Sequence, residues 1–142
     1  MKKASEVMTK DLVWCSPDDT VSKAAQLMKT EDIGPILIVD NEESRRLVGI
    51  VTDRDLALKV VGEGRDPNTT KVEEVMTRKL VTARADDEVE NAMKAMAQYQ
   101  LRRIPVVDEN DRLVGIIAQA DVATRVDKPE KTAEVVKEIS EP

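Results

Sequence analysis

Two stretches of the chain carry apolar side chains three or four residues apart, each shortly after a pair of aspartates. The apolar positions are Val21, Ala24, Ala25 and Met28 in the first stretch and Val89, Ala92, Met93 and Met96 in the second. Such spacing places the side chains on one face of a helix, and a polar residue in front of it is typical of a helix N-cap. The pattern therefore predicts two amphipathic helices, capped by the pairs Asp18-Asp19 and Asp86-Asp87.

Each predicted helix is followed by two short runs that are rich in aliphatic and β-branched residues. The runs span residues 36–39 and 47–51 in the first half of the chain and residues 104–107 and 113–117 in the second. Aspartate and asparagine separate the members of each pair, as in a β-hairpin. A further helix is expected after each hairpin, beginning near Thr52 and near Ala118. Each half therefore predicts the order strand, helix, strand, strand, helix, which is an α/β fold.

The two halves are copies of one repeat. Val7-Met8-Thr9 recurs 68 positions later as Val75-Met76-Thr77. Later segments recur 66 positions apart, because residues 41–46 form a longer turn than residues 109–112, and surface turns tolerate insertions. Glycine, proline and asparagine between the copies are typical of a linker. We therefore expect repeat 1 at residues 3–62, a linker at 63–70, repeat 2 at 71–127 and a C-terminal helix or tail at 128–142.

Composition limits the partners that the chain is expected to bind. A net charge of −6 and only two aromatic residues, Trp14 and Tyr99, disfavour nucleic acid, which is bound through clustered basic residues and aromatic stacking. The longest aliphatic run, residues 36–39, is far short of a membrane span, so we expect a cytoplasmic protein with no membrane partner. The single cysteine, Cys15, excludes an intramolecular disulfide and is expected to be a buried thiol.

Catalytic chemistry is not indicated by the sequence. The chain has no histidine, so Cys15 has no imidazole partner for nucleophilic catalysis. Adjacent aspartates before a helix are better explained as caps than as Mg²⁺ ligands. A general acid–base pair of carboxylates is compatible with the sequence, but nothing motivates one. We therefore expect no catalytic residue, no metal site and no required cofactor.

The strongest local motif runs from a strand directly into a helix. In residues 49–55, Thr52 and Asp55 place a hydroxyl and a carboxylate three residues apart in a first helical turn, which in one interpretation is a capping arrangement. In the other interpretation, the rigidly held carboxylate accepts charge-assisted hydrogen bonds from both hydroxyls of a ribose. The second copy keeps the carboxylate as Asp121 but has Ala118 in place of the threonine. Because pure capping would more readily keep the hydroxyl, the retained acid indicates a role beyond capping.

In order and spacing, these repeated motifs resemble a pair of cystathionine-β-synthase (CBS) domains over about residues 3–127. The matching positions are Met8-Thr9 and Met76-Thr77, the Asp-Asp-x-Val helix starts, the run Arg-Arg-Ile-Pro-Val-Val-Asp at residues 102–108 and the Gly-x-x-Thr-x-x-Asp run that ends at Asp55. The resemblance implies two pseudo-symmetric repeats packed as one module. It also implies two clefts between the repeats, which bind adenosyl compounds such as AMP, ADP, ATP or S-adenosylmethionine.

The same resemblance implies which residues line each cleft, because each cleft mixes both repeats. The first cleft joins Thr52 and Asp55 to Val81, Arg102, Arg103, Ile104 and Pro105, and the second joins Asp121 to Val13, Ile33, Gly34, Ile36 and Arg54. A guanidinium group suits phosphate because its planar fork donates two parallel hydrogen bonds, so we expect the first cleft to bind phosphorylated adenosine more tightly. The second cleft has Gly34-Pro35 in place of the paired arginines, and Leu37 where the family usually has proline.

The function implied by the resemblance is a non-enzymatic regulatory module that senses adenine nucleotides, and through them the energy state of the cell. An effector protein of unknown identity would read the bound state. The resemblance also implies a homodimer paired through helices. The alternative function is a ligand-free scaffold for dimerisation or for docking onto a partner protein, and a dimer with empty clefts would favour it.

Overall fold

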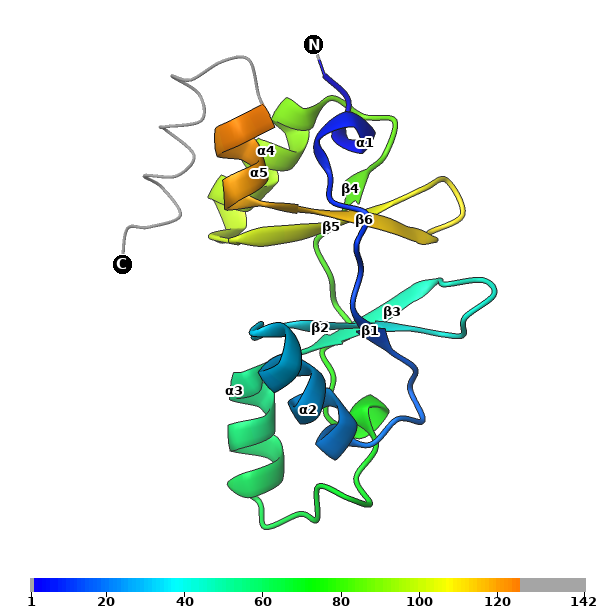
Figure 1. Ribbon diagram of the computed structural model, residues 1–142, viewed down its shortest axis with the longest axis vertical. Helices are drawn as coiled ribbons and strands as arrows, with labels where there is room; N and C mark the ends of the chain where they lie inside the picture. The colour runs from blue at the N-terminus through cyan, green and yellow to red at the C-terminus, as the bar shows by residue number, and fades with distance from the viewer. Residues whose placement is uncertain (1, 126–142) are drawn as a thin grey trace. The chain divides into compact units, whose positions relative to one another are not determined.

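A computed structural model describes the backbone of residues 2–125 and the side chains of residues 2–122, so the helix or tail predicted at 128–142 lies outside the described residues. The first half of the chain contains α1 (Ala4–Val7), β1 (Trp14–Cys15), α2 (Val21–Glu31), β2 (Ile36–Val39), β3 (Leu47–Val51), α3 (Asp53–Leu56) and a π-helical turn η1 (Ala57–Val61). The second half contains the 3₁₀ turn η2 (Val72–Glu74), β4 (Ala83–Arg84), α4 (Val89–Tyr99), β5 (Arg103–Val107), β6 (Leu113–Ala118) and α5 (Gln119–Arg125) (Figure 1). The predicted α/β fold is confirmed.

The strands form two three-stranded sheets of the same topology. The first has the order β1-β2-β3 and the second the order β4-β5-β6. In each, the first strand pairs parallel with the second, and the second pairs antiparallel with the third. Both hairpins shift register at the same place, after Ile38 in one sheet and after Val106 in the other. The two repeats therefore share this register shift as well as their sequence motifs.

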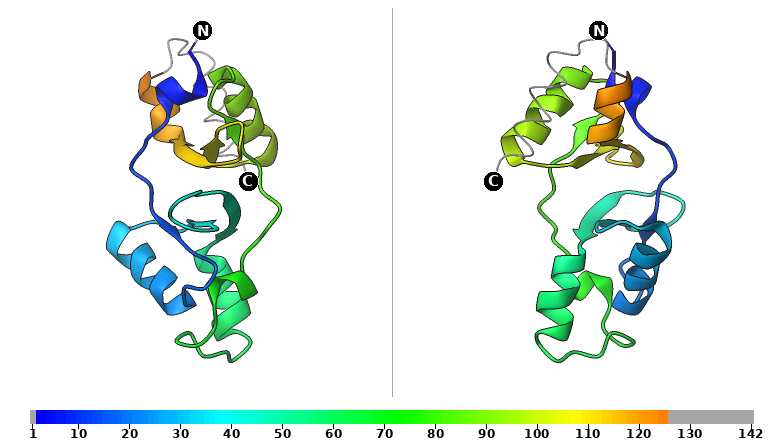
Figure 2. Two further views of the ribbon diagram at one scale, coloured as in Figure 1. Left: turned by 90° about the vertical axis from the view of Figure 1, so that its right-hand side faces the viewer. Right: turned by 60° about the vertical axis from the view of Figure 1, so that its left-hand side comes forward.

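Helices cover one face of each sheet, α2 and α3 in the first case and α4 and α5 in the second (Figure 2). Alternate residues of the middle strands point to that face: Ile36 and Ile38 are fully buried in one core, and Ile104 and Val106 in the other. This is the period-two alternation of a strand, and the residues between them are buried as well. The two aliphatic cores explain why the chain folds without phenylalanine.

The compact units of the structure are not the contiguous repeats. One unit, here called the first-repeat unit, comprises Val13–Leu80, and the other, the second-repeat unit, joins residues 2–12 to residues 81–125. We call residues 3–12 and 71–80 the opening segments of the two repeats. Each opening segment packs in the unit that holds the strands of the other repeat. The chain passes from one unit to the other twice, between Leu12 and Val13 and between Leu80 and Val81.

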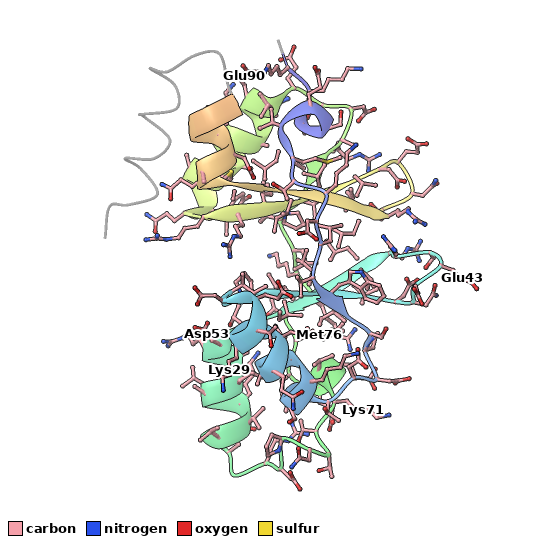
Figure 3. The ribbon with its side chains drawn as sticks, viewed as in Figure 1. Lys29, Glu43, Asp53, Lys71, Met76 and Glu90 are labelled. Carbon is pink, nitrogen blue, oxygen red and sulfur yellow. The ribbon has the colours of Figure 1, made fainter. Side chains whose placement is uncertain are left out.

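Equivalent contacts hold the two opening segments in place. Thr9 pairs with Ile116 through two backbone hydrogen bonds of 2.8 and 3.0 Å, and Thr77 pairs with Ile50 through two of 2.8 and 3.0 Å. Beside each pair a methionine side chain packs against a strand glycine, Met8 against Gly115 and Met76 against Gly49. Met76 is labelled in Figure 3. A Cβ atom at either glycine would overlap the methionine sulfur. Glycine is therefore required at both positions for close approach.

The predicted Asp-Asp caps are wrong by one residue. The N-cap of α2 is Thr20, whose hydroxyl accepts from the Lys23 N–H at 3.2 Å, and the N-cap of α4 is Glu88, which makes no side-chain cap bond. Asp19 instead accepts from the Ser16 N–H at 2.8 Å, and its counterpart Asp87 accepts from the Glu88 N–H at 2.8 Å. The aspartates thus stabilise the turn that leads into each helix, where their carboxylates reach backbone N–H groups outside the helix.

The predicted linker packs on the first-repeat unit and completes the start of α2. The Val21 N–H donates to the Thr70 carbonyl at 2.9 Å, and the Ser22 N–H donates to the Pro67 carbonyl at 3.0 Å. Thr70 is itself buried, with 4% of its surface exposed. These bonds satisfy N–H groups that have no partner within a helix, so the segment has a structural role beyond connecting the repeats.

The longer turn of the first repeat is organised by one aspartate. Asp40 accepts from the Arg46 N–H at 2.9 Å, as Asp108 accepts from the Arg112 N–H at 3.0 Å in the second repeat. The two extra residues also bring the Ser44 hydroxyl onto Asp40. That hydrogen bond is the largest cause that lowers the pKa of the Asp40 carboxyl.

Replacing Gly115 by alanine tests the packing of the opening segment. We expect Gly115→Ala to lower the free energy of unfolding by about 1–3 kcal/mol, because the added methyl group overlaps the Met8 side chain. The double variant Gly115→Ala/Met8→Ala should be less destabilised than the two single changes add up to, since the shorter residue removes the overlap. Urea denaturation measures both, and strict additivity would contradict the contact.

Candidate functional site

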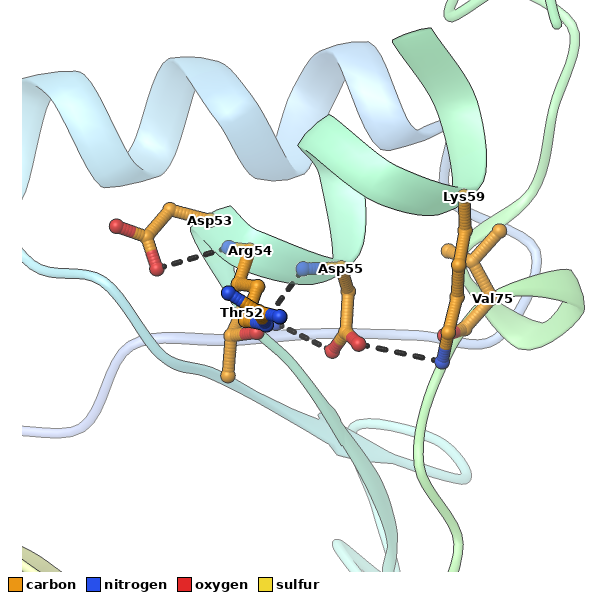
Figure 4. A network of polar contacts seen from close by, with 6 residues as sticks. All are labelled: Thr52, Asp53, Arg54, Asp55, Lys59 and Val75. Atoms are coloured by element: carbon orange, nitrogen blue, oxygen red, sulfur yellow. Dashed lines mark hydrogen bonds and ion pairs between the residues drawn. The ribbon is translucent and has the colours of Figure 1, made fainter. Parts of the chain in front are cut away.

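The start of α3 is a capping box. The Thr52 hydroxyl accepts from the Asp55 N–H at 3.1 Å, and the Asp55 carboxylate accepts from the Thr52 N–H at 2.9 Å (Figure 4). Each side chain thus satisfies a backbone N–H of the other residue. The capping interpretation of the sequence motif is confirmed.

The second oxygen of Asp55 is bound by a lysine one turn later. Lys59 Nζ lies 3.2 Å from Asp55 Oδ1 and also donates to the Val75 carbonyl at 3.0 Å. The Asp55 side chain is 16% exposed and that of Lys59 is 42% exposed, so one edge of the carboxylate reaches solvent. Lys59 therefore connects the start of α3 to residues that precede the crossing at Leu80 (Figure 4).

The equivalent carboxylate of the second repeat is held by different groups. Asp121 Oδ2 accepts from the Ala118 N–H at 2.8 Å, and the Thr9 hydroxyl donates to the two oxygens of Asp121 at 3.2 and 3.4 Å. The acid therefore caps its helix start without a threonine at position 118. Capping by the acid alone is therefore sufficient to account for its position, and a role of Asp121 beyond capping stays a prediction.

The segment before each middle strand lies against the start of the last helix of the same unit. Helices α2 and α4 both end in a left-handed residue, Asp32 with φ 53° and Gln100 with φ 54°, which turns the chain toward that segment. The Asp53 N–H then donates to the Gly34 carbonyl at 3.2 Å. In the other unit the Gln119 N–H donates to the Arg102 carbonyl at 2.9 Å.

The predicted site residues fall into two groups, one on each unit. The first-repeat unit holds Val13, Ile33, Gly34, Ile36, Thr52, Arg54 and Asp55, and the second-repeat unit holds Val81, Arg102, Arg103, Ile104, Pro105 and Asp121. Each cleft predicted from the sequence takes residues from both groups. The pairing of the groups into clefts stays a prediction.

The predicted site residues differ in what they offer a ligand. Ile36 and Ile104 are fully buried core residues, so only their backbone atoms are available. Arg102 and Arg103 are exposed, and within residues 2–125 neither guanidinium makes a hydrogen bond or an ion pair. Within the described residues both arginines are thus solvent-exposed side chains, and their contact with phosphate stays a prediction.

Sequence reasoning missed two residues that touch the carboxylates. Lys59 follows Asp55 by four positions, a spacing at which opposite charges meet on a helix, so its contact was predictable. Thr9 belongs to the repeated Met-Thr motif, but sequence order gives no sign that it packs in the unit of the second repeat. Its contact with Asp121 depends on that packing.

A buried thiol and an aromatic ring stand next to each other on β1. Cys15 is 1% exposed, as predicted, and burial together with the nearby Asp19 raises its pKa to about 11. The Trp14 ring is half-buried and has the Arg45 guanidinium 5.7 Å from its centroid, which is within cation–π range. The protonated thiol is a poor nucleophile.

A small hollow lies beside β4 and the start of α4 in the second-repeat unit. It is lined by Thr82, Ala83, Arg84, Asp87, Glu88, Asn91 and Ala92 and has a volume of about 110 Å³, well below the roughly 300–1,000 Å³ of small-molecule pockets. Among the side chains that the structure describes, no three His, Cys, Asp or Glu residues gather as metal ligands would. No helix of residues 2–125 has the length and hydrophobicity to cross a membrane.

Comparison with known proteins gives related sequences for nearly the whole chain. A model of the family described as "CBS domain" matches residues 4–62 and 72–128. The CBS domain-containing protein YhcV of Bacillus subtilis is 39% identical over 140 residues, covering 99% of this chain and 96% of that protein. Inosine-5'-monophosphate dehydrogenase of Methanocaldococcus jannaschii is 41% identical over 130 residues, but the match covers 92% of this chain and only 25% of that enzyme.

Solved structures with the same fold include two that carry small ligands. Hypoxic Response Protein I, solved with two coordinated zinc ions, superposes with a TM-score of 0.77 at 33% identity, covering 88% of this chain and 99% of that one. A CBS domain pair solved with 5'-methylthioadenosine and S-adenosyl-L-methionine superposes with a TM-score of 0.70 at 29% identity, covering 86% of this chain and 97% of that one.

The two helix starts give a matched test of capping. Thr52→Ala should lower the free energy of unfolding by about 1 kcal/mol, because one of the two cap bonds is lost. Ala118→Thr should raise it by a similar amount or less, because it adds the missing acceptor in the second repeat. Urea denaturation compares both with the parent chain. An unchanged Thr52→Ala variant would show that the box contributes nothing.

The raised pKa of Cys15 predicts a loss of stability in alkali. Between the ordinary value of 9.0 and about 11, the thiol ionises in the unfolded chain but not in the folded one, so unfolding becomes easier as pH rises through this range. At pH 11 the loss due to Cys15 should be on the order of 2 kcal/mol. Denaturation curves of the parent chain and Cys15→Ala from pH 8 to 11 separate this loss from other titrations. Parallel curves would refute it.

Proposed function

The chain belongs to the CBS-domain family, and on that premise we propose that it binds adenosyl compounds, with AMP, ADP and ATP as its ligands. CBS-pair modules are regulatory ligand-binding domains. The ligand class proposed here rests on one observation above all. Each unit holds a carboxylate rigidly at a helix start, Asp55 in one and Asp121 in the other.

A carboxylate fixed in this way is suited to the two hydroxyls of a ribose. One oxygen of Asp55 accepts from the Thr52 N–H and the other is bound by Lys59. The side chain remains 16% exposed, and a carboxylate has about four lone-pair sites, two more than these contacts use. Lone pairs therefore remain for a diol. Because the acceptor is charged, each such hydrogen bond contributes about 1.5–3 kcal/mol.

Two exposed arginines support phosphorylated ligands. Arg102 and Arg103 precede the buried part of β5, and within the described residues their guanidinium groups have no protein partner. We propose that they bind the phosphates of a nucleotide whose ribose is held by Thr52 and Asp55. The opposite combination, Asp121 with Arg54, offers fewer cations and is proposed to bind nucleotides more weakly.

The related structure with two adenosyl ligands supports the adenosyl class but not the number of phosphates. Its ligands, 5'-methylthioadenosine and S-adenosyl-L-methionine, carry none, so the preference for AMP or ATP rests on the arginine pair of this chain. A regulatory role in the cytoplasm, a homodimer and an unidentified effector protein complete the proposal. A related CBS protein is hexameric, so the oligomeric state of this chain should be measured together with ligand binding.

The proposed ligand class is tested by calorimetric titration with adenosine, AMP, ATP and S-adenosylmethionine. Asp55→Ala should weaken adenosine and ATP alike by about tenfold or more, because it removes the acceptor for the ribose. Arg103→Ala should weaken AMP and ATP but leave adenosine unchanged. Asp53→Asn is the matched control, since within the described residues the side chain of this exposed neighbour accepts only from the Arg54 N–H.

Three results would reject parts of this proposal. No heat with any ligand at millimolar concentration rejects adenosyl binding, and a stable dimer with empty clefts then favours the scaffold function. Equal losses for adenosine and ATP in both variants reject the phosphate role of Arg103. Titrating the parent chain in parallel and checking each variant's thermal melting separates lost binding from lost folding.

A further inference from the structure

Each carboxylate proposed to bind ribose is also bonded to a segment that leads to a crossing between units. We call residues 9–12 and 75–80 the crossing segments, because the chain changes unit after Leu12 and after Leu80. The Thr9 hydroxyl donates to Asp121. On the other unit, Lys59 bridges Asp55 and the Val75 carbonyl.

The two repeats make this connection by different chemistry. Thr9 and Thr77 are equivalent residues with equivalent backbone pairs, yet Thr9 contacts its carboxylate through its own hydroxyl, while on the other unit the contact runs through a lysine side chain to a backbone carbonyl. The connection is therefore present in both units although the residues that make it have diverged.

The two connections differ in strength. The Thr9 hydroxyl lies 3.2 and 3.4 Å from the oxygens of Asp121, which is long for an O–H···O bond. The Lys59 ammonium lies 3.2 Å from Asp55 and is held by a second acceptor at 3.0 Å. Both bonds have a charged acceptor, but a ribose hydroxyl is the same kind of neutral donor as the Thr9 hydroxyl, whereas Lys59 pairs a positive charge with Asp55. A ribose hydroxyl therefore replaces Thr9 more readily than it replaces Lys59.

We propose that Thr9 and Lys59 are positioning residues that make the two sites unequal in signalling. A diol bound at Asp121 displaces the Thr9 hydroxyl and loosens the crossing segment 9–12. A diol bound at Asp55 leaves Lys59 in place, and the crossing segment 75–80 stays held. This inference rests on the proposed function, because it requires an adenosyl ligand at the carboxylates.

Amide hydrogen exchange of the full chain, with adenosine as the probe, tests the proposal. The amides of Thr9 and Ile116 report the first crossing segment, and those of Thr77 and Ile50 report the second, since each pair is joined by backbone hydrogen bonds. Saturating adenosine should speed exchange at Thr9 and Ile116 by about threefold to tenfold. Exchange at Thr77 and Ile50 should not change.

Two threonine variants make the test specific. Thr9→Val should show the faster exchange at Ile116 without ligand, should gain nothing further from adenosine, and should bind adenosine about threefold more tightly, because the competing hydroxyl is gone. Thr77→Val is the matched control, because its backbone pair is the same and, within the described residues, its hydroxyl makes no hydrogen bond. It should behave like the parent chain.

The outcomes separate this inference from the function on which it rests. If the parent chain binds adenosine while exchange at Thr9 and Ile116 is unchanged, the signalling role is wrong and ligand binding stands. If Thr9→Val and Thr77→Val respond alike, the role of the Thr9 hydroxyl is wrong. If no adenosyl compound binds at all, the proposed function fails first and the inference fails with it.

Discussion

The exchange of opening segments between the two units is the constraint on which the rest of the structure depends. Each segment adds a backbone pair to the edge of a sheet and places a methionine on a strand glycine. The same segments then supply Thr9 and Val75, whose contacts reach the carboxylates at the helix starts. One set of contacts therefore links the core, the helix starts and the crossing segments. Because protein interiors are closely packed, we expect a change in one of these parts to disturb the others.

The two repeats keep their backbone geometry and differ in the side chains that complete it. Register shifts, left-handed helix ends and the bond from the last helix to the segment before the middle strand recur in both units. The carboxylate at the helix start recurs too, and in both cases it accepts from a backbone N–H. Lys59 also binds it in one unit and the Thr9 hydroxyl in the other. The two helix starts therefore share a backbone arrangement but differ in the side chains around the carboxylate.

The sequence predicted the elements well because each pattern occurs twice and local periodicity determines it. The bounds of β2 and β3 are those expected, and β5 and β6 are each one residue longer. The caps were misplaced because Asp, Thr and Glu all occupy the turns before the helices, and the choice among them depends on backbone angles. The exchange of segments was not predictable, because periodicity describes which face of an element is buried but not against which copy it packs.

The offset between sequence repeat and folded unit also has a consequence for the order in which the protein is made. Val13–Leu80 is continuous in the chain, so this unit can close as soon as Leu80 has left the ribosome. Residues 2–12 are synthesised earlier, but Thr9 can contact Ile116 and Asp121 only after β6 and α5 have been synthesised. Residues 2–12, although synthesised before the first-repeat unit, are thus packed after it.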